Sequence, residues 1–150
     1  MTTMRIAELA WGNVRAACDL KVKPEQAQLV APVAISLAEA YVVGDAAWPR
    51  VVYDGDRLVG FVMAGFAPAG PAAFRCNLWR LLIAADQQGK GYGRFAVEAV
   101  IQEARRRGHT TLHVFWSPGE DGPQKFYLRL GFRPNPDWDG RGEVPGRLDF

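Results

Sequence analysis

The sequence predicts an α+β fold in which helices pack on a mixed β-sheet. Two apolar runs flank Asp54-Gly55-Asp56-Arg57, which indicates a β-hairpin because Asp-Gly is a strong short-turn signal. Residues 77–83 form a nearly continuous apolar run, as expected of a buried central strand. Residues 91–107 carry one apolar stripe at helical spacing and precede a β-branched and aromatic strand at 111–116. Strands on both sides of this helix, with a hairpin upstream, favour a sheet with parallel and antiparallel pairs.

The remaining elements are short and follow from local signals. We expect a first strand at 4–9, a helix from Asn13 to about Leu20, and a helical turn at Pro24. Ser36 and Glu39 form an S-x-x-E capping box, which predicts a helix over 36–43. Residues 67–73 are a Pro/Gly/Ala loop, 123–130 a short helix, and 144–150 an edge strand weakened by Pro145 and Gly146.

The amino-acid composition limits the classes of protein to which the chain could belong. The chain has 150 residues, 49% of them hydrophobic and 23% charged, which fits a single domain over 1–150. A net charge of +2 gives no reason to expect nucleic acid, and no apolar run approaches a membrane span. No signal-peptide core follows Met1, and Cys18 and Cys76 lack metal-site spacing. We therefore expect a cytoplasmic protein that needs no metal.

A glycine-rich loop lies between the central strand and the long helix. It reads Gln88-Gly89-Lys90-Gly91-Tyr92-Gly93-Arg94. Alternating glycines let successive amides face one concavity, and a helix N-terminus adds partial positive charge there. The spacing fits neither a Walker A loop nor a Rossmann fingerprint, but it satisfies Q/R-x-x-G-x-G/A. The loop is therefore a candidate site for phosphate oxygens.

That motif resembles the pyrophosphate loop of the GNAT N-acetyltransferase superfamily. A second segment, Phe126-Tyr127-Leu128-Arg129-Leu130-Gly131-Phe132, is similar to the family's helix with a catalytic tyrosine and a closing Gly-Phe. The resemblance implies a twisted, mostly antiparallel sheet of six to seven strands with a splayed parallel central pair and about four helices. Several short segments, among them Leu78-Trp79-Arg80, also resemble a diamine or spermidine acetyltransferase subgroup, although Val33 stands where we expect asparagine in that subgroup.

The resemblance also implies acetyl-CoA as cosubstrate and assigns the site residues. The backbone of Leu81, Leu82 and Ile83 would pair with pantetheine, and residues 88–94 would hold the pyrophosphate. Further cofactor contacts are implied at Glu120, Gly122, Pro123 and Phe126. Tyr127 would protonate the leaving thiolate after direct attack of the amine on the thioester; otherwise it is a core aromatic.

The acceptor side and the general base are left open by the sequence. The base could be Glu39, Glu120, Glu143, His113 or a bound water. Glu39 also has a structural alternative as the partner of Ser36 in the capping box. Substrate contacts are expected from Glu39, Trp79, Trp116 and Glu143. Arg80 interrupts a buried run, so we expect it to line a cleft or to pair with a carboxylate.

Several functions fit these patterns. The leading hypothesis is acetylation of a primary amine on a small molecule, with a diamine or polyamine first, because Asp137, Asp139 and Glu143 could supply an acidic lining. Alternatives are modification of an antibiotic, acetylation of a protein or peptide, and a non-catalytic acyl-CoA sensor. Similar proteins are commonly homodimers, so a homodimer is also expected.

Overall fold

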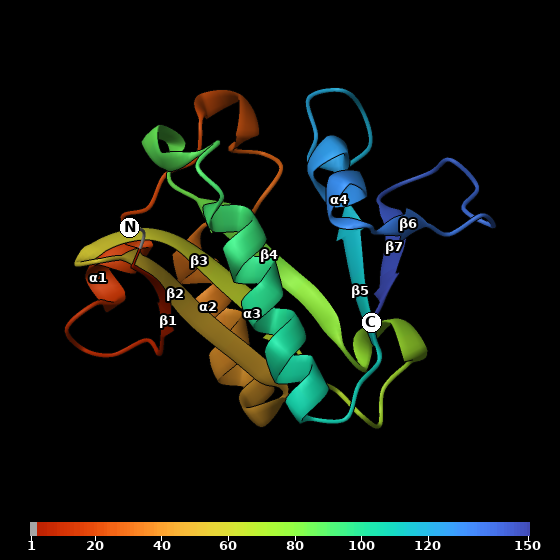
Figure 1. Cartoon of the computed structure of the whole chain (residues 1–150), viewed down its shortest axis with the longest axis horizontal. Helices are drawn as coiled ribbons and strands as arrows, with labels where there is room; N and C mark the ends of the chain where they lie inside the picture. Colours follow the sequence, from red (N-terminus) through yellow and green to blue (C-terminus); the bar gives the residue numbers. More distant parts are fainter. Residues whose placement is uncertain (1–2) are drawn as a thin grey trace.

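The structure, a computed structural model that describes residues 3–150, is built on one seven-stranded sheet (Figure 1). The strands are β1 (Met4–Ala7), β2 (Ala47–Asp54), β3 (Arg57–Gly65), β4 (Asn77–Ile83), β5 (Thr111–Trp116), β6 (Arg133–Pro134) and β7 (Val144–Asp149). Their order across the sheet is β1-β2-β3-β4-β5-β7-β6. All neighbours are antiparallel except β4 and β5. The expected mixed fold is therefore confirmed.

Helices cover the two faces of the sheet. They are α1 (Val14–Cys18), α2 (Val33–Val43), α3 (Tyr92–Arg106) and α4 (Gln124–Leu130), with 3₁₀ turns at η1 (Pro24–Gln26), η2 (Gly44–Ala46), η3 (Ala72–Phe74) and η4 (Ala85–Gln87). The apolar stripe of α3, including Val97 and Val100, packs in one cluster with β3, β5 and Tyr127. Ala17 of α1 and Val33 of α2 pack in a second cluster. Neighbouring residues Val51 and Val52 of β2 enter different clusters, as strand alternation requires.

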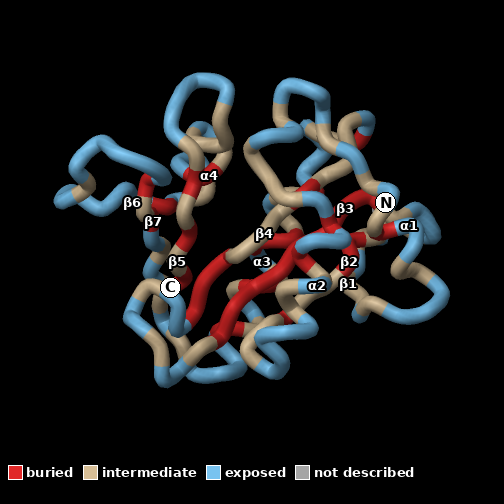
Figure 2. Tube along the Cα trace, turned by 180° about the vertical axis from the view of Figure 1, so that it is seen from behind, coloured by how far each residue is buried: buried red, intermediate tan, exposed pale blue. Residues whose placement is uncertain are grey.

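The central pair of strands separates soon after it forms. β4 and β5 are paired only at Asn77 with His113 and at Leu78 with Val114. Beyond Leu78 the two strands diverge, and in Figure 1 a gap between their ribbons opens toward α4. Burial is greatest along β2 to β5, whereas the connecting loops are exposed (Figure 2). The predicted splayed parallel pair is thus present in the middle of the sheet.

The hairpin and the strands at 77–83 and 111–116 are confirmed with small changes in boundaries. The hairpin strands are longer than expected, and Pro49 lies inside β2. The helix at 13–20 is shorter, spanning Val14–Cys18, and the turn at Pro24 is present as η1. No helix within residues 3–150 has the length and hydrophobicity needed to cross a bilayer.

The capping-box prediction at Ser36 is wrong. Helix α2 begins at Val33, after an extended Pro32 that accepts the first helical N–H bonds. Ser36 therefore lies in the helix interior, fully buried, and its hydroxyl has no hydrogen-bond partner among residues 3–150. Because Ser36 is not the N-cap of α2, Glu39 is not its capping-box partner.

The strand predicted at 144–150 is confirmed as β7, but its predicted place at the edge of the sheet is wrong. β7 lies between β5 and β6, with Arg147 opposite both His113 and Arg133. The carbonyl of Pro145 accepts the Asn135 N–H at 2.7 Å, so only the missing N–H of the proline is lost to the sheet. Gly146 is needed here because a Cβ would lie 2.2 Å from the Trp116 ring. The edge itself is the two-residue β6, which is too short to leave a pattern in the sequence.

Candidate active site

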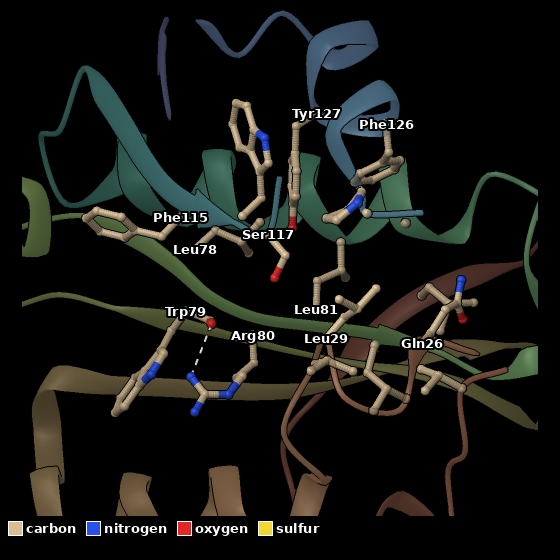
Figure 3. Close-up of a pocket in the computed structure, with 18 of the residues that line it drawn as sticks. Gln26, Leu29, Leu78, Trp79, Arg80, Leu81, Phe115, Ser117, Phe126 and Tyr127 are labelled. Atoms are coloured by element: carbon tan, nitrogen blue, oxygen red, sulfur yellow. Dashed lines mark hydrogen bonds between the residues drawn. The ribbon is translucent and has the colours of Figure 1, made fainter. Parts of the chain in front are cut away.

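A cleft of about 1700 Å³ opens where β4 and β5 separate. Its walls come from β4, β5, α4, the glycine loop and the segment that connects η1 to α2. Figure 3 shows Leu81 of β4 on one side of the cleft and Tyr127 and Phe126 of α4 on the other. The cleft thus brings together the strand, the loop and the short helix that were selected from the sequence.

A β-bulge shapes the β4 wall. Met63 pairs with Arg80 and Ala64 pairs with Leu78, which leaves Trp79 as the extra residue. Trp79 packs with the cluster beneath α2, and Arg80 forms an ion pair with Glu39 of α2. The bulge therefore turns two consecutive large side chains toward α2 at the point where the strands part.

The glycine loop presents unpaired main-chain donors. Gly89 and Gly91 have φ values of 80° and 90°, a region that side chains disfavour, and a Cβ at either would meet nothing within 4 Å. Within residues 3–150, no main-chain amide of residues 89–94 donates to a main-chain carbonyl. The first helical bond of α3 runs from the Phe95 N–H to the Gly91 carbonyl at 3.1 Å. These amides at the start of a 15-residue helix fit an anionic diphosphate.

The polar side chains of the glycine loop have different hydrogen-bond partners and positions relative to the cleft. Gln88 Nε2 donates to the Ile83 carbonyl at 3.0 Å and to Gln26 Oε1 at 2.8 Å, and Gln26 Nε2 donates back to Gln88 Oε1 at 3.1 Å. This amide pair connects the loop to η1 across the end of the cleft. Lys90 donates to Gln87 and does not line the cleft, whereas Arg94 does line it.

Three residues of β4 line the cleft as expected. Leu81, Leu82 and Ile83 all contribute to its wall, although the Leu82 side chain packs in the cluster beneath α2. No pairing with β5 extends past Leu78, so this part of β4 has no strand neighbour on that side. The Ala84 N–H donates to the Val59 carbonyl of β3, so strand alternation directs the main-chain groups of Leu82 toward β3 and those of Leu81 and Ile83 toward the open side. Because the Ile83 carbonyl already accepts the Gln88 amide, Leu81 is the freer position for pairing with a ligand.

Tyr127 is enclosed by aromatic rings and is only 7% exposed. Its ring stacks on Trp116 with centroids 5.4 Å apart and meets Phe126 and Phe132 edge-on. The hydroxyl end points into the cleft toward β4 (Figure 3) and makes no hydrogen bond to another residue within 3–150. Burial, with a smaller contribution from the Glu143 carboxylate, raises the pKa of Tyr127 well above its usual value. The phenol is therefore a neutral donor at physiological pH.

Only part of the segment around the start of α4 lines the cleft. Gly122, Pro123 and Phe126 line the cleft, whereas Glu120 is exposed and does not. The Phe126 ring packs against Gly93, where a Cβ would lie 3.0 Å from it. The third loop glycine is thus required for helix α4 to approach α3.

The candidate bases are not gathered in one place. Arg80 Nη2 donates to Glu39 Oε1 at 2.8 Å; Arg80 lines the cleft, but Glu39 does not. Arg80 was expected to line a cleft or to pair with a carboxylate, and it does both. Glu143 lines the cleft with Trp79 and Trp116, whereas the exposed Asp137 and Asp139 do not.

His113 lies outside this cleft. Burial, followed by the nearby Arg147, lowers the pKa of His113, and the Asp149 carboxylate opposes that change. Residues 3–150 contain no cluster of His, Cys, Asp or Glu suited to a metal ion.

Sequence reasoning missed several residues of the cleft. Ser117 follows β5 and lies beside Tyr127 (Figure 3), and Phe74, Asn77 and Gln26 also line the walls. Ser117 could have been found as the first residue after a predicted strand beside a candidate site. The others carried no local signal, because their position depends on the bulge and on where η1 and η3 fold back.

Residues 16–132 match the family described as "Acetyltransferase (GNAT) family". This match spans more than half of the chain, and the chain belongs to the GNAT acetyltransferase family.

The individual relatives match only part of this chain and at low sequence identity. The chain is 32% identical over 81 residues to the uncharacterized N-acetyltransferase ycf52 of Pyropia yezoensis, covering 54% of this chain and 42% of that protein. It is 26% identical over 101 residues to an L-2,4-diaminobutyric acid acetyltransferase of Wolinella succinogenes, covering 65% and 57%. The chain thus spans about half the length of the curated relatives it matches. In structure it resembles the paia N-acetyltransferase of Thermoplasma acidophilum, solved in complex with coenzyme A, with a TM-score of 0.72, 13% identity and 99% of each chain covered.

Proposed function

We propose that this chain transfers an acetyl group from acetyl-CoA to a primary amine of a small molecule. The observation that carries the proposal is the row of amides at 89–94, which donate to no main-chain carbonyl of the described chain and lie at one end of a cleft that also contains the Tyr127 hydroxyl. A diphosphate at the helix N-terminus would use donors that the protein itself leaves free. Membership of the GNAT family and the coenzyme A complex of the Thermoplasma protein support the same cosubstrate.

The cleft geometry supports a direct transfer. Pantetheine would lie along β4 beyond Leu78, where the strand lacks a neighbour, and would lead the thioester toward Tyr127. The amine attacks the carbonyl carbon, and the resulting oxyanion needs a donor such as a β4 amide. When the C–S bond breaks, the Tyr127 hydroxyl donates its proton to the sulfur.

The base is proposed to be Glu143 or a water beside it. An alkylamine has a pKa near ~10.4 and must lose a proton before it attacks. Glu143 lines the cleft and acts electrostatically on Tyr127, whereas Glu39 is held by Arg80 outside the lining. Glu39 is proposed instead to position the Arg80 side chain beside the acceptor, through the hydrogen bond between them.

A diamine or polyamine acceptor is one finer form of the hypothesis. Its support is the pair of carboxylates in the cleft lining of the described chain, Asp121 and Glu143. The diaminobutyric acid acetyltransferase name of the Wolinella relative is also consistent with a short diamine. An antibiotic or a peptide amine, and acyl-CoA sensing without transfer, are the alternatives that an assay must separate.

The test has two parts, both on the full chain. Acetyl-CoA, but not ATP or NAD, should raise the melting temperature, since a ligand that binds the native state stabilises it. Release of free thiol should then depend on an added amine. Stabilisation without amine-dependent thiol release would favour a sensor and contradict the enzymatic proposal.

A further inference from the structure

We propose that the acceptor is a single primary amine attached by a short linker to an aromatic ring. This inference rests on the proposed function and concerns the half of the cleft away from the glycine loop. We call the aromatic end the part of the lining formed by Phe74, Trp79 and Phe115. In Figure 3, Phe115 and Trp79 lie on the side of Tyr127 opposite to Gln26, which bonds to the glycine loop.

The aromatic end offers uncovered ring surface in a concave site. Phe74 and Phe115 stack with centroids 5.7 Å apart at 25°, yet Phe74 is 47% exposed. Trp79 and Phe115 are only partly buried, and both line the cleft. Partly exposed rings in a pocket are typical of a site that buries a flat apolar ligand, because aromatic pairs gain from stacking as well as burial.

Charge argues against an acceptor with several cationic groups. In the described chain, the cleft lining has two carboxylates, Asp121 and Glu143, and Asp121 adjoins Gly122 and Pro123, which are expected to contact the cofactor. Arg80, next to Trp79, is already paired with Glu39. A second ammonium at the aromatic end would have no free carboxylate there and would be desolvated without a partner. One amine near Glu143 and Tyr127 requires only the carboxylate that is present.

A polar group completes the aromatic end. Asn77 is buried, lines the cleft, and its carboxamide forms no hydrogen bond to another residue within 3–150. The carboxamide atoms of Asn77 are not sealed from the cleft, so they can form a hydrogen bond with a hydroxyl or similar substituent on the ring of the acceptor. The aromatic end therefore offers stacking surface, one hydrogen-bonding group and a neutralised arginine.

The test compares 2-phenylethylamine with putrescine and spermidine as acceptors, at saturating acetyl-CoA, by release of free thiol. We expect kcat/KM for 2-phenylethylamine to exceed that for either polyamine by at least tenfold. Phe115→Leu and Trp79→Leu should each raise the KM for 2-phenylethylamine about tenfold and leave the KM for acetyl-CoA unchanged. Trp11→Leu, a change at a side chain 90% exposed outside the cleft, is the control and should alter neither.

The outcomes separate the inference from the function on which it rests. A higher kcat/KM for putrescine or spermidine would overturn the aromatic acceptor and leave the acetyltransferase proposal standing. The inference would also fall if both folded variants, checked by thermal melting, kept the wild-type KM for 2-phenylethylamine. Stabilisation by acetyl-CoA with no transfer to any amine would overturn the proposed function, and the acceptor with it.

Discussion

The aromatic surroundings of the Tyr127 side chain determine whether its hydroxyl can act as a proton donor. Trp116, Phe126 and Phe132 surround the ring, and the hydroxyl faces the cleft. Removal from water disfavours the phenolate and raises the pKa of Tyr127. The phenol therefore keeps its proton over the working pH range and can give it to a departing thiolate.

Replacing Tyr127 by Phe should lower kcat about a hundredfold, the size of effect expected for a general acid. Affinity for acetyl-CoA should change little, because the ring and its stacking on Trp116 remain. Because the pKa of Tyr127 is raised, the wild type should show no loss of kcat from phenol ionisation below about pH 10. Tyr41→Phe is the matched control at a side chain that is 89% exposed. Unchanged kcat in Tyr127→Phe would rule out the acid role.

Ser36→Ala should stabilise the protein. The Ser36 hydroxyl is buried inside α2 and finds no partner in the described part of the chain, and an unsatisfied polar group costs about 1–3 kcal/mol. Alanine removes that cost and has higher helix propensity, so the melting temperature should rise by about 2–4 °C for each kcal/mol recovered. Calorimetry of the two proteins measures the change; a lower melting temperature would mean that the hydroxyl has a native partner.

Individual site residues were predictable where the signal was local. Gly89, Gly91 and Tyr127 could be selected because each belongs to a short motif. The partner of Arg80 could not be named, because Glu39 is 41 positions away and was assigned to a cap that Ser36 does not form. The same holds for Gln26 and Gln88, which are 62 positions apart.

At the scale of elements, the glycine loop and the start of α3 act together. Positive φ at Gly89 and Gly91 turns the chain between β4 and α3, and the amides that follow are the unpaired donors of the helix N-terminus. The glycines are thus needed for backbone conformation, since a Cβ would meet no neighbour.

Gly91→Ala should therefore weaken acetyl-CoA binding at least about tenfold, because a Cβ in the left-handed region costs about 1–2 kcal/mol and shifts the loop. Gly108→Ala is a close control: its φ is 88°, a Cβ there also meets nothing within 4 Å, and it follows the other end of α3. Both variants should lose similar stability, but only Gly91→Ala should lose affinity in a calorimetric titration. Equal affinities for the two would contradict the assignment of the loop.

The opposite end of α3 is held by an ionic cluster. Glu103 bonds to Arg106 and Arg107, and the hydrogen bond from Arg106 is the main reason that the pKa of Glu103 falls to about 2. A lowered carboxyl pKa stabilises the fold above the unfolded value of 4.5, and that contribution disappears as the pH falls toward 2.

Glu103→Gln should thus reduce the free energy of unfolding by about 1–2 kcal/mol at pH 7, allowing for solvent screening. The difference from wild type should shrink as the pH is lowered from 4.5 toward 2 in urea denaturation. Glu98→Gln, on the same helix with only a 3.9 Å contact to Arg94, should change stability little at any pH. A deficit independent of pH would show that ionisation of Glu103 is not the cause.

At the scale of the whole molecule, the cleft is a consequence of sheet topology. β4 and β5 are adjacent and parallel but paired at two positions only, so the sheet opens where the loop, α4 and β4 meet. The order of elements and the parallel pair could be predicted because the motifs and strand patterns are sequential. The bulge at Trp79, the short β6 and the start of α2 at Val33 could not, since long-range packing sets them.

The most direct measurement is an amide chemical-shift titration of the ¹⁵N-labelled protein with coenzyme A. The largest changes are expected at the amides of residues 89–94, with smaller changes along β4 and at Tyr127. If coenzyme A left those amides unchanged, or shifted mainly residues outside the cleft, the proposed site would be contradicted.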